Sequence, residues 1–187
     1  MRLKIDSEEG LMKRILTVLA AMMFLGACAA NAQDGNPIST QLKGSWMNAR
    51  DLLTKMAEKM PDENYRFKPT PELQDFGQRM AHVITFSMRA CSQVKGEQQN
   101  LNFSATPTKA EVTAAMKQVN EECDSVFNSL TDADLQKMVN AGRGVQRSEF
   151  ALLEGLVLEH SQEVYGYSAV YLRLKGIVPP SSERNER

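Results

Sequence analysis

Apolar side chains recur at steps of three and four residues along four stretches of the chain, a spacing that places them on one face of an α-helix. The stretches are residues 42–60, 75–95, 108–130 and 148–176. Each has polar residues on its other side, so each is predicted to be an amphipathic helix with one buried face. The positions predicted to face inward are Leu42, Trp46, Ala49, Leu53, Met56, Met60, Phe76, Met80, Val83, Ile84, Ser87, Cys91, Val94, Val112, Met116, Val119, Cys123, Val126, Phe127, Leu130, Leu153, Leu156, Val157, His160, Val164, Tyr167 and Tyr171.

Local signals mark where these helices start. Asp75 followed by Gln78, and Thr108 followed by Glu111, have the spacing of a capping box. In that arrangement the first side chain accepts a hydrogen bond from the new helix, and the second bonds back to the cap. Ser148 is predicted to cap the last helix. Three of the four helices therefore have starts that the sequence defines.

The connecting segments differ in character. Residues 61–74 contain three prolines, which predicts an ordered, extended connector whose Tyr65 and Phe67 pack against the helices. Residues 131–139 are predicted to add a short helical turn, and residues 140–147 to form a flexible loop. Four amphipathic helices can bury their apolar faces only against one another, so the predicted fold class is all-α, a four-helix bundle.

Residues 1–32 have the layout of a secretory signal peptide. Two basic residues, Lys13 and Arg14, precede an apolar run at residues 15–25 and then a series of small residues. The run is too short to cross a bilayer, so we expect no transmembrane span in the mature protein. The acidic stretch before Met12 does not suit a signal peptide, which favours Met12 as the true start.

Two outcomes of export remain open. Residues 30–32 read Ala-Asn-Ala, which fits cleavage after Ala32, and this is the outcome we favour. Residues 25–28 read Leu-Gly-Ala-Cys and resemble a lipobox, in which Cys28 would be lipidated. The protein is therefore expected to be exported, either periplasmic or secreted, with a lipid anchor at Cys28 as the alternative.

After the signal peptide, the predicted order is a linker at 33–41, the bundle at 42–176 and a flexible tail at 177–187. The chain is 42% hydrophobic with a formal net charge of −1, and removing residues 1–32 leaves a net charge of −2. A chain of this composition can bury a core, which excludes a wholly disordered protein. It also lacks the basic excess of a nucleic-acid-binding protein, so no nucleic-acid partner is expected.

Two cysteines fall on inward positions of neighbouring predicted helices. Cys91 lies in the second helix and Cys123 in the third, and both would reach an oxidising compartment after export. A disulfide between them is one interpretation, provided that their Cα atoms approach within about 7 Å. Two buried free thiols that act as small apolar side chains are the other.

Two longer stretches carry a family resemblance. MPDENYRFKPTPELQDFGQRMAHVITF and LEHSQEVYGYSAVYLRLKGIVPPSS together resemble the DinB-like family of bacterial four-helix bundle proteins. The resemblance implies an up-down-down-up bundle, often a homodimer, that holds a divalent metal through three histidines. One histidine comes from the second helix, and two come from the last helix in a His-x-x-x-His arrangement. Residues four apart stack on one helical face, so two such imidazoles can bind one ion.

This chain matches that pattern only in part. His82 and His160 occupy two of the histidine positions, and Val164 occupies the third. The chain has no other histidine, so a substitute ligand would have to be a carboxylate. Glu163 is the nearest candidate and Glu159 a poorer one. The alternative is that the two histidines are buried or groove-lining polar residues, hydrogen-bonded to neighbours such as Tyr167.

Two hypotheses follow. In the first, the protein is an exported DinB-like bundle with an incomplete metal pocket at His82 and His160, where Zn, Ni, Mn or Fe would bind. In the second, it is a non-catalytic periplasmic bundle that binds a partner protein or a small ligand. The sequence identifies neither a reaction nor a substrate.

Overall fold

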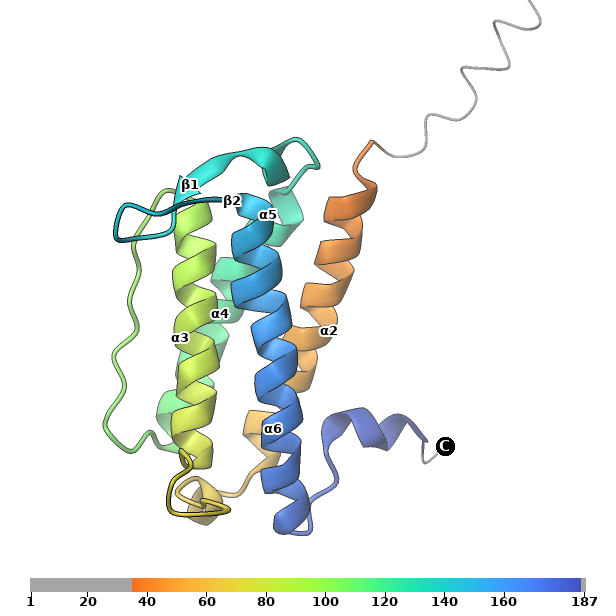
Figure 1. The fold of residues 1–187 in the computed structure, drawn as a ribbon. Helices are drawn as coiled ribbons and strands as arrows, with labels where there is room; N and C mark the ends of the chain where they lie inside the picture. The colour runs from red at the N-terminus through yellow and green to blue at the C-terminus, as the bar shows by residue number, and fades with distance from the viewer. Residues whose placement is uncertain (1–34, 186–187) are drawn as a thin grey trace, which may run out of the picture. The chain divides into compact units, whose positions relative to one another are not determined.

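Four helices packed side by side make up the protein in the computed structural model, which describes residues 35–185. The first three are α2 (Pro37–Lys59), α3 (Phe76–Val94) and α4 (Lys109–Ser129). The fourth rod is continuous and consists of α5 (Glu149–Leu152), η3 (Leu153–Glu159) and α6 (His160–Leu174). Figure 1 shows that α2 and α6 run in one direction and α3 and α4 in the other. The predicted all-α class and the up-down-down-up order are therefore confirmed.

The parallel pair α3 and α4 requires a connection that returns along the bundle. Residues 95–108 run back beside α3 to the start of α4 (Figure 1). At the end of this connection, the carbonyl oxygen of Pro107 lies 2.3 Å from the place that a Cβ on Gly77 would occupy. The backbone N–H of Gly77 also donates to the carbonyl oxygen of Tyr65, at 2.9 Å. The close approach of these segments therefore requires glycine at position 77.

Replacing Gly77 with alanine is expected to lower the free energy of unfolding by about 1 to 3 kcal/mol, because the backbone has to move to admit the methyl group. Gly44 in α2 supplies the matched control, since nothing lies within 4 Å of its Cβ position. Gly44→Ala should stabilise the protein by about 0.5 to 1 kcal/mol through helix propensity. Urea unfolding of both variants checks the difference, and equal shifts would contradict it.

Both predicted capping boxes are confirmed. Asp75 accepts from the backbone N–H of Gln78 at 2.7 Å, and the Gln78 side chain accepts from the backbone N–H of Asp75 at 3.0 Å. Thr108 and Glu111 make the same reciprocal pair at the start of α4. These caps satisfy backbone donors that a helix start otherwise leaves without partners.

The linker predicted at 33–41 is wrong in its second half, because α2 begins at Pro37. A long-range contact explains the early start. The carboxylate of Asp132 accepts from the backbone N–H groups of Ile38 and Ser39, at 3.2 and 2.7 Å. An acceptor from 93 residues further along the chain thus satisfies the first turn of the helix.

The single α-helix predicted at 148–176 is also corrected. Ser148 caps it as expected, accepting from the backbone N–H of Ala151 at 3.2 Å, but η3 is a π-helix of 7 residues. A π-helix places more residues in each turn than an α-helix. Beyond it, Val164 and Tyr171 are nevertheless buried as predicted. Tyr167, predicted to face inward, is 53% exposed, whereas Ser168 is buried.

The segment before α5 contains a small β-hairpin that the sequence did not predict. The helical turn expected in 131–139 is limited to η2 (Asp134–Gln136), after which β1 (Met138–Asn140) pairs antiparallel with β2 (Gln146–Ser148). The flexible loop expected at 140–147 is the turn of this hairpin and part of β2. It has positive φ at Gly142, Arg143 and Gly144. The glycines accommodate that backbone, which other residues rarely adopt.

The connector and the C-terminal segment are both ordered against the bundle. Residues 61–74 include η1 (Asp62–Asn64), and Tyr65 is buried as predicted, with its hydroxyl donating to the carbonyl of Ala57 at 2.7 Å. The flexible tail predicted at 177–187 is corrected over η4 (Pro180–Asn185). There the backbone N–H of Ser181 donates to the hydroxyl of Tyr165 at 2.8 Å, which fixes the segment.

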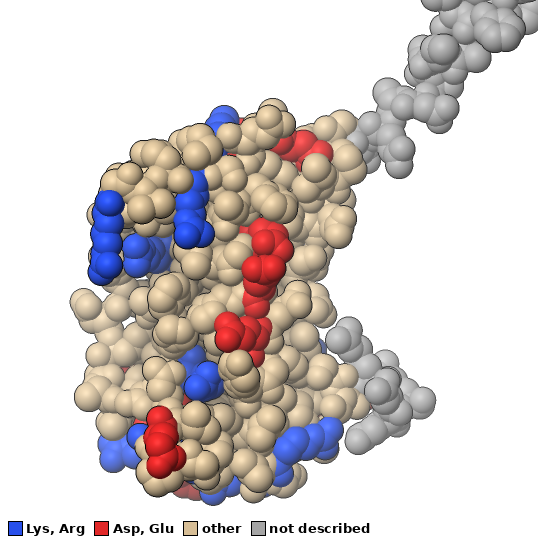
Figure 2. All heavy atoms as spheres, in the orientation of Figure 1, with Lys and Arg blue, Asp and Glu red and all other residues tan. Residues whose placement is uncertain are grey.

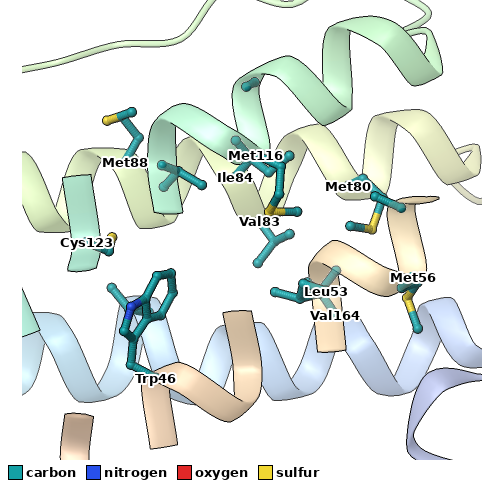
Figure 3. Packing of buried hydrophobic residues seen from close by; sticks show 14 of the residues in the cluster. Trp46, Leu53, Met56, Met80, Val83, Ile84, Met88, Met116, Cys123 and Val164 are labelled. Carbon is teal, nitrogen blue, oxygen red and sulfur yellow. The ribbon is translucent and has the colours of Figure 1, made fainter. Parts of the chain in front are cut away.

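The core lies between all four helices (Figure 3). Trp46 stacks on Phe127 with ring centroids 5.4 Å apart, and its indole N–H donates to Asp124 at 2.7 Å. Cys91 and Cys123 are joined by a disulfide with a Cα–Cα distance of 5.3 Å, which links α3 to α4. Over residues 35–185, no helix combines the length and apolar character that crossing a membrane requires.

Candidate functional site

The two histidines of the chain lie against each other in the seam between α3 and α6. The ring centroids of His82 and His160 are 4.9 Å apart, with an interplanar angle of 73°. Phe86, one turn after His82, contacts both rings at centroid distances of 4.7 and 5.3 Å. Residues 78 positions apart in the sequence thus form one aromatic cluster.

The hydrogen bonds of His160 set the roles of its two nitrogens. Its Nδ1 lies 3.2 Å from the Oε2 atom of Glu163, one turn further along α6. A carboxylate accepts only, so this contact assigns the ring proton to Nδ1. The Nε2 atom then carries a lone pair, and it is buried without a hydrogen-bond partner within residues 35–185. A buried acceptor of this kind is costly unless something occupies it.

His82 is held in its neutral form by its surroundings. Burial lowers the pKa of His82, and the neighbouring His160 and Arg79 lower it further, while Glu163 opposes them. Burial disfavours the charged imidazolium, and nearby cations repel it. At neutral pH His82 is therefore an imidazole with a free lone pair, which is the form that binds metal ions.

The depressed pKa of His82 predicts a loss of stability in acid. The unfolded chain takes up a proton near the ordinary histidine pKa of about 6.5, whereas the folded chain resists it. The contribution is therefore complete above that value and is lost as pH falls through the lower folded value. Urea unfolding between pH 8 and 5 should show this loss in the wild type and less of it in His82→Gln. Parallel pH profiles for the two proteins would contradict the assignment.

Arg79 is a member of this cluster that the sequence analysis did not identify as a site residue. Its guanidinium lies over the rings of Tyr167 and Tyr171, at 5.2 and 5.9 Å from their centroids. Its Nε atom is buried and has no hydrogen-bond partner within the described part of the chain. Tyr167, which the sequence analysis named as a hydrogen-bond partner for the histidines, therefore contacts the guanidinium of Arg79. The signal available in the sequence was the three-residue spacing that places Arg79 beside His82 on one face of α3.

His82 also lines a groove of about 410 Å³ between α3 and the returning connection. Thr85 and Phe86 continue its wall along α3, and Leu101 and Phe103 form the opposite side. The sequence analysis placed His82 at the edge of the buried stripe, and the groove agrees with that position. A volume of this size accommodates a small organic molecule.

Val164 does not lie in an open position of this site. It is 1% exposed and belongs to the hydrophobic cluster that also contains Leu53 and Met80 (Figure 3). Within residues 35–185, no group of three or more His, Cys, Asp or Glu side chains is arranged to hold a metal ion. The three-histidine set that the resemblance implies is therefore incomplete, and Glu163 contacts His160 instead of adding a third donor.

The two donors that are present nevertheless suit a metal. A metal-binding histidine commonly donates its other ring N–H to a carboxylate, as the His160 and Glu163 pair does. Glu154, Glu159 and Glu163 follow one another along the rod that carries His160. Figure 2 shows a band of acidic side chains on this part of the surface, with basic side chains gathered over the hairpin. These carboxylates favour a cation beside His160, whereas the charge of Arg79 opposes one at His82.

The remaining site residues of the sequence analysis lie elsewhere. Cys91 and Cys123 form the disulfide between α3 and α4, and both are completely buried. The predicted signal peptide at 1–32, the cleavage site at Ala32 and the lipidation site at Cys28 all lie outside the described residues.

Comparisons with known proteins agree with this fold. Residues 45–162, more than half of the chain, match the model of the DinB superfamily. The chain belongs to the DinB superfamily. This assignment covers α3 and α4 together with the start of α6, and so includes both histidines.

Several DinB-like proteins are similar to this chain. The uncharacterized protein YjoA of Bacillus subtilis is 23% identical over 141 residues, which cover 74% of this chain and 91% of YjoA. Its crystal structure has a TM-score of 0.59 and covers 73% of this chain and 92% of that one, at 21% identity. A DinB-like protein of Bacillus cereus has a TM-score of 0.62 at 18% identity, and the match covers 79% of this chain and 98% of that one. Mycothiol-dependent maleylpyruvate isomerase has a TM-score of 0.52 at 12% identity, and the match covers 70% of this chain and 59% of that one.

Proposed function

We propose that this DinB-superfamily protein is exported and binds a divalent metal ion through His82 and His160. The observation that carries the proposal is the buried Nε2 atom of His160, which has no hydrogen-bond partner within the described residues and lies in a ring packed against His82. Both imidazoles present lone pairs, and the neighbouring carboxylates favour a cation. Export rests on the signal-peptide pattern of residues 1–32.

The residues around the pair have distinct roles in this proposal. Glu163 holds the Nδ1 proton of His160 and thereby directs Nε2 toward the ion. Phe86 packs on both rings, limits their rotation and excludes water from one side. With only two protein ligands, the ion would keep several positions for water or a substrate. When bound, such an ion would lower the pKa of a coordinated water or thiol so that the anion forms near neutral pH.

The resemblance to mycothiol-dependent maleylpyruvate isomerase concerns the fold, and we infer no substrate from it. The second candidate function is a non-catalytic bundle that binds a small ligand or a partner. The groove of about 410 Å³ beside His82 favours this alternative, because a ligand can occupy it without any metal. A second copy of the chain is the partner that the family resemblance implies.

Metal titration of the mature protein, purified without a histidine tag, tests the proposal. We expect one equivalent of Zn, Ni, Mn or Fe to bind the wild type, and His160→Ala to abolish measurable binding. Glu163→Gln should weaken binding by about 10 to 100-fold, the usual effect of removing a carboxylate behind a ligating histidine. Glu121→Gln, on the distant α4 surface, is the control and should bind like the wild type. Absence of binding by all four metals would leave the ligand-binding alternative.

A further inference from the structure

A second cleft, separate from the histidines, lies where the ends of α3 and α4 meet the hairpin and the start of α5. It has a volume of about 320 Å³. Its wall contains the last residue of α3, the last turn of α4 and four charged residues, which are Lys95, Asp134, Lys137 and Glu149. None of its lining residues lines the groove at His82. The cleft is therefore an independent site.

Glu149 is the unusual member of this wall. It is only 6% exposed, and among residues 35–185 its carboxylate makes no hydrogen bond or close ion pair, although the charge of Lys137 acts on it. Its backbone N–H donates to the carbonyl oxygen of Lys137 at 2.8 Å, which holds the residue against the hairpin. The carboxylate oxygens are not fully enclosed and reach the cleft, so a donor bound there can bond to a side chain that is otherwise largely removed from water.

The other charges of the wall are already paired. Lys137 contacts Asp134 at 2.5 Å, and Lys95 contacts Glu122 at 3.0 Å. Among the described residues, Glu149 is therefore the one charged side chain of the wall without a close ion pair, and Lys137 acts on it only at longer range. The C-terminal ends of α3 and α4 also form the wall, and helix C-termini carry a partial negative charge. A cation fits this environment, whereas an anion would meet an unpaired carboxylate.

We propose that this cleft binds a small molecule with a primary ammonium group, and that Glu149 is the counter-ion of that group. An ammonium offers three donors, of which Glu149 accepts one or two, and the hydroxyl groups of Ser125 and Ser129 are further acceptors in the wall. Burial raises the pKa of Glu149, and the charge of Asp134 adds to this effect while that of Lys137 opposes it. A bound ammonium would reverse that shift.

Calorimetric titration with 1,4-diaminobutane, and with 1,4-butanediol as its uncharged analogue, tests the proposal. We expect the diamine to bind the wild type and the diol not to bind. Glu149→Gln keeps the shape of the side chain and removes its charge, so it should weaken diamine binding at least about tenfold, or roughly 1.4 kcal/mol. The control Glu154→Gln removes a carboxylate of the same rod that does not line the cleft, and should bind normally.

A measurement on the wild type alone guards against misfolding of Glu149→Gln. On adding the diamine, backbone amide signals of Ser125, Ser129 and Glu149 should shift together, while those near His82 should not. Any of three results would overturn the proposal. Glu149→Gln could bind the diamine as tightly as the wild type, or sodium ion at the same concentration could displace the diamine. The third result is a set of signal shifts spread over the whole surface. None of these results bears on metal binding at the histidines, so the two proposals can fail separately.

Discussion

Removing the disulfide between Cys91 and Cys123 is expected to lower the free energy of unfolding by about 3 to 4 kcal/mol. The bond closes a loop with a sequence separation of 32 residues, and so restricts the unfolded chain. It also joins α3 to α4, the parallel pair that no short loop connects. Urea unfolding of the double variant Cys91→Ala, Cys123→Ala against the oxidised wild type measures the effect.

The control separates the bond from the packing of the two sulfur atoms. Wild-type protein unfolded in the presence of a reductant should lose most of the same stability, because its thiols remain in place while the bond is absent. The mass of the oxidised protein should also be lower by two hydrogen atoms. If oxidised and reduced wild type unfold at the same urea concentration, the bond does not contribute to stability.

Replacing Val164 with histidine is expected to have two opposite effects. Without metal, the variant should lose about 1 to 3 kcal/mol, because a polar ring replaces an apolar side chain that is 1% exposed. With metal, the third imidazole one turn from His160 should tighten binding by more than about tenfold, or roughly 1.4 kcal/mol. At a metal concentration 100 times the dissociation constant, binding should return about 2.7 kcal/mol of stability.

Val119 provides the matched control for this variant. It is 2% exposed and lies on α4, in the core rather than beside the histidines. Val119→His should lose a similar amount of stability and gain no metal affinity. Calorimetric titration and urea unfolding with and without zinc distinguish the two variants. Loss of stability without any gain in affinity at position 164 would show that this position does not face the pair.

Much of the fold follows from local sequence signals. The capping boxes at Asp75 and Thr108 fix the starts of α3 and α4, and the spacing of apolar residues identifies the buried faces. The errors arise where distant contacts decide the structure. Asp132 starts α2 earlier than the linker composition indicates, and the hairpin strands pair with each other although neither has an apolar alternation. The π-helix η3 also has no sequence signal that periodicity detects.

The site was predictable in its composition but not in its geometry. The family resemblance selected His82 and His160, and the structure brings their rings into contact. The role of Glu163 could be placed only to within one helical turn, because a side chain at that spacing can bind a metal or a neighbouring ring. Arg79 and Glu149 escaped notice because the burial of a charged side chain is a property of three-dimensional packing, not of spacing along the chain.

Nuclear magnetic resonance of the two imidazoles tests the central claim most directly, because the chain contains only two histidines. In tag-free protein we expect the ring signals of His82 and His160 to shift together and to saturate at one equivalent of zinc. Before zinc is added, His82 should titrate below the ordinary value of about 6.5, in line with its lowered pKa. Independent shifts of the two rings, or no shift at several equivalents of zinc, would contradict a shared metal site.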